Sequence, residues 1–214
     1  SFCGIVGLKP TYGTVSRYGL MAMASSLDQI GPMTRNVADA RIVFEVIAGK
    51  DERDSTSVEY QIPDTRYLPT GDLSKGDKIQ DLRIGVPKEY FIKGMDPEVE
   101  KSVKNAIKKL ESAGAKIQDI SLPYSTDDAL AAYYVIMPCE VSANLARYDG
   151  IKYGYSDSGA KDLMEVYLKS RKEGFGKEVR RRIIIGTYAL SSGYYEAYYL
   201  QAQKVRTKII EDFN

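Results

Sequence analysis

Three consecutive arginines, Arg180, Arg181 and Arg182, are the side chains of this sequence best suited to binding an anion. They lie in a segment, 177–191, whose apolar residues recur at three- and four-residue intervals, which predicts an amphipathic helix. Arg181 then points away from the apolar face, whereas Arg180 and Arg182 flank it. A solvated run of charges is the ordinary interpretation. The alternative is that Arg180 or Arg182 turns inward, where a guanidinium can meet a carboxylate with two parallel hydrogen bonds.

A serine nucleophile is the second chemistry that the sequence raises. Ser25 and Ser26 precede Asp28, but the chain contains no histidine, which excludes Ser-His-Asp and Cys-His catalysis. No local pattern places a lysine beside either serine. We therefore interpret residues 25–28 as a turn or a helix cap and assign no catalytic residue within the chain.

Composition excludes several other classes of protein. The net charge is +1, from 30 basic and 29 acidic side chains, which argues against a nucleic-acid-binding domain. Cys3 and Cys139 lie too far apart in sequence to form a typical metal-ligand pair, and we expect both to be reduced, buried thiols. No apolar run approaches the roughly 20 residues of a membrane span. The 17 tyrosines indicate half-buried surfaces such as interfaces or cavities.

Strand and helix signals alternate in the first part of the chain, which predicts an α/β fold. Residues 1–35 indicate short strands and loops, and Asn36 is placed to cap a helix that ends before Gly49. Residues 50–81 are polar and aperiodic, as expected of connecting loops. Residues 82–122 then predict a strand, a helix and a second strand, a parallel βαβ unit.

The second half of the chain predicts mostly helices. The first of them begins after Thr126 and contains Pro138, which is expected to kink or divide it. Further helices are expected at residues 160–172, 177–191 and 194–213. In the βαβ unit, Pro97 is expected to be the first helical residue, after an Asp96 cap.

The chain resembles the amidase signature family in three N-terminal stretches: Ser-Phe-Cys-Gly-Ile-Val-Gly-Leu-Lys-Pro-Thr-Tyr-Gly at 1–13, Ser-Arg-Tyr-Gly-Leu at 16–20, and Ala-Ser-Ser-Leu-Asp-Gln-Ile-Gly-Pro-Met-Thr-Arg at 24–35. Later stretches at 147–155, 174–183 and 186–199 narrow the resemblance to the glutaminase subunits of tRNA-dependent amidotransferases. In that family a lysine, a bridging serine and the nucleophilic serine lie upstream of Ser-Phe-Cys-Gly. The resemblance therefore implies an internal piece of a longer subunit, without its catalytic residues.

The resemblance also implies an architecture. We expect part of a mixed β-sheet flanked by helices, followed by a largely helical C-terminal half. Residues 1–214 would form a single incomplete amidase domain. Its parts would be a core segment after the nucleophile (1–49), connecting loops (50–81), the βαβ unit (82–123) and a helical part that lines the glutamine pocket (124–214).

The resemblance implies a role in glutamine binding for two residues. Arg182, the last arginine before Ile183, matches the residue that binds the α-carboxylate of glutamine. Tyr133, with Tyr134 as the runner-up, matches the tyrosine beside the bound glutamine. The implied reaction is hydrolysis of glutamine to supply ammonia for the ATP-dependent conversion of Glu-tRNA(Gln) to Gln-tRNA(Gln).

The implied partners are glutamine and the B and C subunits of the amidotransferase, with tRNA reached through the B subunit and no membrane involved. The glutaminase subunit would need no cofactor, since ATP and Mg would be used by the partner subunit. A cytoplasmic location is expected, or an organellar matrix in a eukaryote. Two alternatives stay open: a stand-alone amidase for small amides, and a non-catalytic module whose Tyr-rich helices bind a partner protein.

Overall fold

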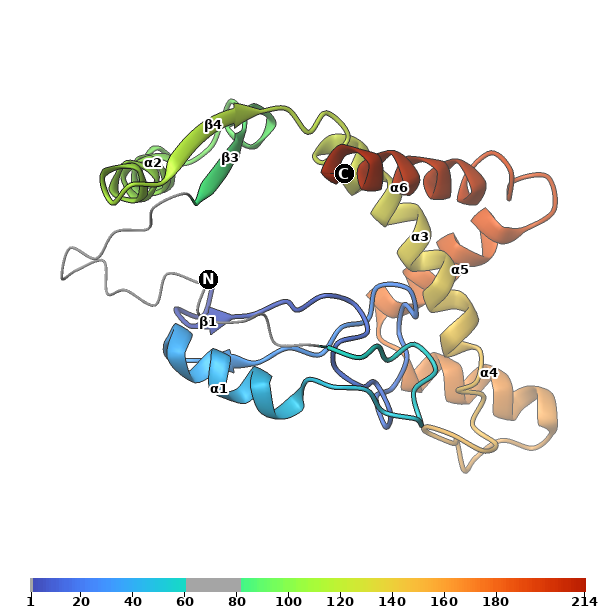
Figure 1. Ribbon diagram of the computed structural model, residues 1–214. Coiled ribbons are helices and arrows are strands. Elements are labelled where there is room, and N and C mark those ends of the chain that lie inside the picture. Colours follow the sequence, from blue (N-terminus) through green and yellow to red (C-terminus); the bar gives the residue numbers. More distant parts are fainter. Residues whose placement is uncertain (1, 61–81) are drawn as a thin grey trace. The chain divides into compact units, whose positions relative to one another are not determined.

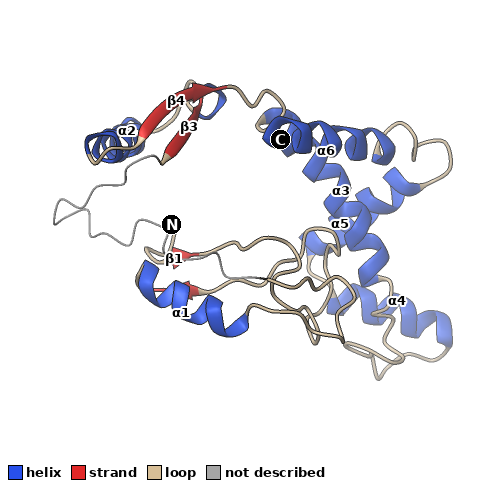
Figure 2. Cartoon of the chain, viewed as in Figure 1, coloured by secondary structure: helices blue, strands red, loops and turns tan. Residues whose placement is uncertain are grey.

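The computed structural model describes residues 2–60 and 82–214 (Figure 1). Tertiary contacts divide the chain into two compact units, which are described separately. The first comprises Ser1–Ile62 and Tyr133–Gln201, and the second comprises Pro63–Ala132 and Ala202–Asn214. Figure 2 shows long helices in the C-terminal half and many loops between short strands before it, as the sequence predicts.

The N-terminal segment of the first unit consists of loops around a short antiparallel pair, β1 (Val6–Gly7) and β2 (Met33–Thr34). The chain turns at residues 11–14, where Thr14 N donates to the carbonyl oxygen of Thr11 at 3.1 Å. Gly13 has φ +82°, and a Cβ atom there would lie 2.5 Å from the carbonyl oxygen of Thr56. Both the backbone conformation and the close approach of the two segments therefore require glycine.

Helix α1 (Val37–Ile47) begins where the sequence predicts, because the Asn36 side chain accepts a hydrogen bond from the backbone N–H of Asp39. Its apolar stripe is less buried than the periodicity suggests. Ala40 is buried, whereas the Val37 side chain is exposed. The local sequence therefore predicts that α1 forms, but it does not predict which of its side chains are buried.

The second unit contains the predicted βαβ arrangement. Strands β3 (Arg83–Pro87) and β4 (Lys116–Ile120) pair in parallel, from Arg83 opposite Lys116 to Pro87 opposite Ile120. A 3-10 turn, η3 (Lys88–Tyr90), and helix α2 (Pro97–Ser112) connect them. The Asp96 side chain accepts from the N–H groups of Glu98 and Val99, which confirms the predicted cap.

The C-terminal half is helical, in agreement with the prediction: it contains α3 (Asp127–Leu145), α4 (Leu163–Gly174), α5 (Lys177–Leu190) and α6 (Tyr199–Phe213). Helix α4 begins later than expected because Asp162 caps it by accepting from Glu165 N. Pro138 was expected to kink or divide α3; the helix continues through it, which excludes a division, and the kink stays a prediction. None of the described helices is long and apolar enough to cross a membrane.

The predicted start of the last helix at residue 194 was also wrong. The chain turns after α5, where Tyr194 N donates to the carbonyl oxygen of Ser191 at 3.0 Å and Gly193 adopts φ +86°. Ring contacts stabilise this turn, with the centroids of Tyr188 and Tyr194 4.3 Å apart. Local periodicity does not reveal such a turn, because its tyrosines continue the apolar pattern of a helix.

The core of the first unit lies where α3 meets the N-terminal segment and α5. Ala24, Met137 and Val141 are buried together, with Leu145 and Ile183 packed against them. Gly186 lies at a close approach of α5 to α3: a Cβ atom there would lie 1.9 Å from the carbonyl oxygen of Pro138. The absence of a side chain at Gly186 therefore allows the two helices to cross.

The two cysteines occupy different environments. Cys139 is buried on α3, as predicted, and burial, followed by the charge of Glu140, raises the pKa of its thiol to about 11. Cys3 is exposed in the turn before β1, so its predicted burial was wrong. Free cysteines are usually buried, but the turn before β1 leaves this one in solvent.

Candidate functional site

Arg182 lies on α5 and, like Arg180 but unlike Arg181, is half-buried. Its side chain is 28% exposed, against 69% for Arg181. This difference follows the helical geometry, which places Arg181 opposite the apolar face and Arg182 at its edge. A partly desolvated guanidinium interacts more strongly with an anion than one in open solvent.

Three side chains surround the Arg182 guanidinium. Its Nε donates to Glu178 Oε1 at 2.9 Å, one helical turn earlier on α5. Its Nη1 lies 3.5 Å from Met137 Sδ, and its Cζ lies 5.8 Å from the ring centroid of Tyr134. A thioether is a weak acceptor, and among the described residues Nη2 donates to no acceptor. The terminal nitrogens thus keep capacity for a carboxylate while Glu178 holds the inner one.

The tyrosine pair on α3 lies beside this guanidinium. The rings of Tyr133 and Tyr134 meet edge to face, with centroids 5.3 Å apart, and both side chains are partly exposed. Tyr134, the runner-up in the sequence analysis, is the ring next to Arg182, and Tyr133 lies one ring further away. The assignment of Tyr133 to a bound glutamine stays a prediction, and the geometry gives Tyr134 an equal claim.

The predicted turn at residues 25–28 is present and forms part of a longer turn, residues 23–28. The Asp28 carboxylate accepts from the backbone N–H groups of Met23 at 2.9 Å and Ala24 at 3.0 Å. Ser25 Oγ accepts from Asn144 Nδ2 at 2.9 Å, and Ser26 donates to Glu140. Sequence reasoning missed both partners on α3. The only available signal was two polar residues four positions apart in a helix that is otherwise largely apolar.

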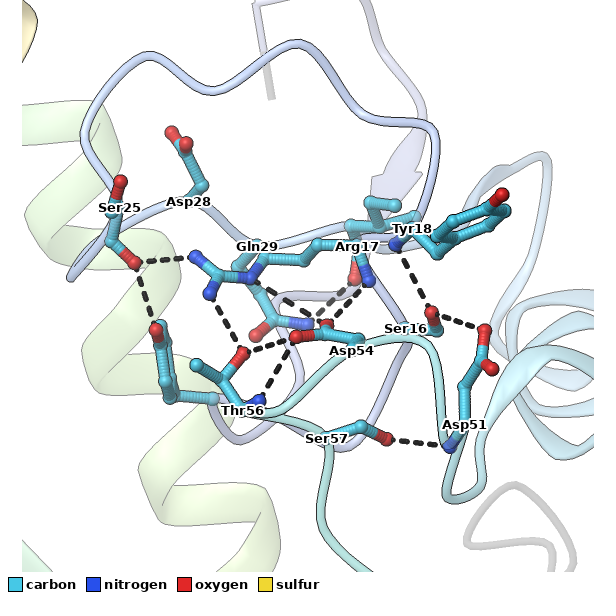
Figure 3. A network of polar contacts seen from close by, with 12 residues as sticks. Ser16, Arg17, Tyr18, Ser25, Asp28, Gln29, Asp51, Asp54, Thr56 and Ser57 are labelled. Carbon is cyan, nitrogen blue, oxygen red and sulfur yellow. Dashed lines mark hydrogen bonds and ion pairs between the residues drawn. The ribbon is translucent and has the colours of Figure 1, made fainter. Parts of the chain in front are cut away.

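A second polar cluster, centred on Arg17, was not predicted (Figure 3). Arg17 Nη2 donates to Thr56 Oγ1 at 2.7 Å, and Nη1 donates to the carbonyl oxygen of Ser25. The backbone N–H of Arg17 donates to Asp54 Oδ2 at 2.8 Å. These contacts join residues 16–28 to residues 51–57 and give the second N-terminal stretch, residues 16–20, a structural role.

A cleft of about 300 Å³ opens beside the Arg17 cluster, lined by Arg17, Tyr18, Gly19, Leu20, Ala22, Ser25, Asp28, Arg53, Asp54 and Ser55. Its lining does not include Tyr133, Tyr134 or Arg182. Arg17 Nε and Asp54 Oδ2 form an ion pair at 3.8 Å in this cleft, although this nitrogen makes no hydrogen bond within the described residues. Cavity size alone therefore does not locate the site that the arginine run predicts.

Asp54 is expected to make the stability of the N-terminal segment depend on acid. The backbone N–H of Arg17, and then the hydroxyl and backbone N–H of Thr56, hold the pKa of this carboxyl below its usual value. A lowered folded-state pKa contributes stability above the unfolded pKa of about 4, and this contribution is lost as pH falls through the folded value. We expect Asp54→Asn to reduce stability at pH 7 and to flatten the decline of stability below about pH 4.

Urea unfolding across this pH range measures the effect. Asp128→Asn is a matched control, because Asp128 is exposed and its carboxylate makes no hydrogen bond within the described residues. If the free energy of unfolding of Asp54→Asn is lower than the parent's but varies with pH in the same way, Asp54 contributes to stability without being the group whose protonation causes the loss in acid.

Comparisons with known proteins agree with the motifs. The amidase family model matches residues 1–214, the whole chain. The chain belongs to the amidase signature family, and its α/β architecture is that of this family. Among its relatives, the glutamyl-tRNA(Gln) amidotransferase A subunit of Carboxydothermus hydrogenoformans is 58% identical over 214 residues, covering 100% of this chain and 43% of the relative.

Two further relatives carry the same description. The A subunit of Thermodesulfovibrio yellowstonii is 58% identical over 214 residues, covering 100% of this chain and 42% of the relative. The crystal structure of the A subunit from Thermotoga maritima superposes with a TM-score of 0.67 at 40% identity, covering 99% of this chain and 40% of that one. The chain thus spans about two fifths of the length of these relatives.

Proposed function

We propose that this chain forms part of the glutaminase subunit of a tRNA-dependent amidotransferase, which hydrolyses glutamine to supply ammonia for converting Glu-tRNA(Gln) to Gln-tRNA(Gln). One observation carries the proposal: Arg182 is partly desolvated, is oriented by Glu178 and lies beside the ring of Tyr134, and its outer nitrogens have capacity for a carboxylate. Glutamine presents a carboxylate at the end remote from its reacting amide. The identity to glutamyl-tRNA(Gln) amidotransferase relatives supports the same assignment.

In this proposal the chain binds and orients the donor. Arg182 would pair with the α-carboxylate through two charge-assisted hydrogen bonds. Tyr133 and Tyr134 would cover the aliphatic part of glutamine, since a tyrosine ring offers an apolar face and a polar tip. Fixing the far end of the substrate holds the side-chain amide in one orientation for attack.

The chemical step would use groups that the family places upstream of Ser-Phe-Cys-Gly. A lysine acting through a bridging serine would activate the nucleophilic serine, which attacks the glutamine amide and forms an acyl-enzyme as ammonia leaves. Water then hydrolyses the acyl-enzyme. We further propose that the chain needs no cofactor, that the B and C subunits are its partners in the cytoplasm, and that the B subunit uses ATP and Mg and contacts the tRNA.

The test is the donor specificity of the complete amidotransferase, with all of its subunits present. Release of glutamate from glutamine, together with formation of Gln-tRNA(Gln) from Glu-tRNA(Gln) and ATP, is the expected result. Hydrolysis of small aliphatic amides without a preference for glutamine would instead identify a stand-alone amidase. Absence of both activities in the assembled, folded complex would refute an enzymatic role.

A further inference from the structure

One face of α3 carries two groups of residues with different partners. Toward its middle, Tyr134 and Met137 contact Arg182. One and two turns later, Glu140 and Asn144 contact the turn at residues 23–28. Residues three and four positions apart share a helix face, so the Arg182 contacts and the turn contacts follow one another along the same helix.

Glu140 and Asn144 hold this turn through hydrogen bonds. Glu140 accepts from Ser26 N at 2.8 Å and from Ser26 Oγ at 2.5 Å. Asn144 Nδ2 donates to Met23 O at 3.1 Å and to Ser25 Oγ at 2.9 Å. A carboxylate that takes both the backbone and the side-chain donor of one serine fixes the position of that residue, and bonds to a charged acceptor are the stronger kind.

Packing continues from this turn to Arg182. Ala24, inside the turn, is 1% exposed and belongs to the same buried cluster as Met137 and Val141. Met137 is 2% exposed, and its sulfur lies against Arg182 Nη1. Because protein interiors are close-packed, a displacement of Ala24 is transmitted to Met137 and then to the guanidinium.

We propose that Glu140 is a positioning residue for glutamine, assisted by Asn144: by fixing the turn at residues 23–28 it holds Ala24 against Met137 and so sets the position of Arg182. This inference rests on the proposed function, because it assigns to Glu140 a role in the binding of the glutamine carboxylate. Glu140 does not touch the substrate in this account, and its effect is exerted through Met137 and Arg182.

The test compares Glu140→Ala and Glu140→Gln in the complete amidotransferase, with glutamine and then ammonium as nitrogen donor. For Glu140→Ala we expect kcat/KM for glutamine to fall roughly threefold to thirtyfold, mainly through KM, the range for a residue that acts on a binding site through its neighbours. Glu140→Gln keeps one acceptor oxygen and should show a smaller loss. Ammonium-dependent activity should stay within about threefold of the parent.

Two further variants separate the possible outcomes. Asp128→Ala, an exposed acid earlier on α3, should change neither activity. Asn144→Ala tests the same turn independently and should also raise KM for glutamine. It replaces Glu140→Ala as the test if the Glu140→Ala protein does not fold. Equal losses with glutamine and ammonium, or no loss with either, would overturn the positioning role.

Failure of this inference differs from failure of the proposed function. If Arg182→Ala impairs only glutamine use while Glu140→Ala and Asn144→Ala do not, the turn does not position the site and the function stands. If the parent complex does not use glutamine at all, the function itself is wrong.

Discussion

Replacing Arg182 with alanine is expected to lower the use of glutamine by roughly tenfold to more than a hundredfold, while the use of ammonia is largely retained. The reason is the loss of a charge-assisted pair with the substrate carboxylate, which ammonia does not possess. Steady-state kinetics of the whole amidotransferase with each donor measures the difference. The structure supports this expectation, because Glu178 orients Arg182 through Nε and leaves its outer nitrogens available to a carboxylate.

Arg181→Ala is the matched control for this variant. Arg181 is adjacent on α5 and is also within reach of Glu178, at 3.2 Å, but its side chain is 69% exposed. We expect little change with either donor. Arg182→Lys should recover only part of the glutamine activity, because an ammonium lacks the planar pair of donors. Equal losses with both donors for Arg182→Ala would favour a structural role in place of carboxylate binding.

Local signals in the sequence predicted most helix and strand boundaries. Asn36 and Asp96 cap helices as expected, because a cap requires only residues two or three positions away. The orientation of Arg182 relative to Arg181 also follows from helical periodicity within α5. Properties of this kind depend on a few neighbouring residues, so one sequence suffices to predict them.

Contacts between distant segments were not predictable in the same way. Ser26 and Glu140 are 114 positions apart, and Arg17 and Thr56 are 39 apart. Nothing in the spacing of Ser25, Ser26 and Asp28 indicates which helix their turn meets. The choice between Tyr133 and Tyr134 is similar: the two are adjacent on α3, and only the position of Arg182 distinguishes them.

The crossing of α3 and α5 leads to the second large prediction, for Gly186→Ala. In an unconstrained helix interior this change stabilises by about 1 kcal/mol, because alanine has the higher helix propensity. At Gly186 the new Cβ atom would lie 1.9 Å from the carbonyl oxygen of Pro138, which is backbone and cannot rotate away. We therefore expect a destabilisation of about 3 kcal/mol, at the upper end of the range for overpacked interiors.

Urea unfolding of the whole glutaminase subunit measures this change, and hydrogen exchange in α3 and α5 locates it. Thr187→Ala is the matched control: Thr187 is the next residue on α5, is exposed, and should be neutral or slightly stabilising when replaced by a better helix former. The sign of the change in stability at Gly186 decides between the two effects, because helix propensity favours alanine there and the contact with Pro138 disfavours it. Because α5 also carries Arg182, a separation of the helices should raise KM for glutamine as well. A stabilised Gly186→Ala protein with unchanged KM would show that the two helices do not approach this closely.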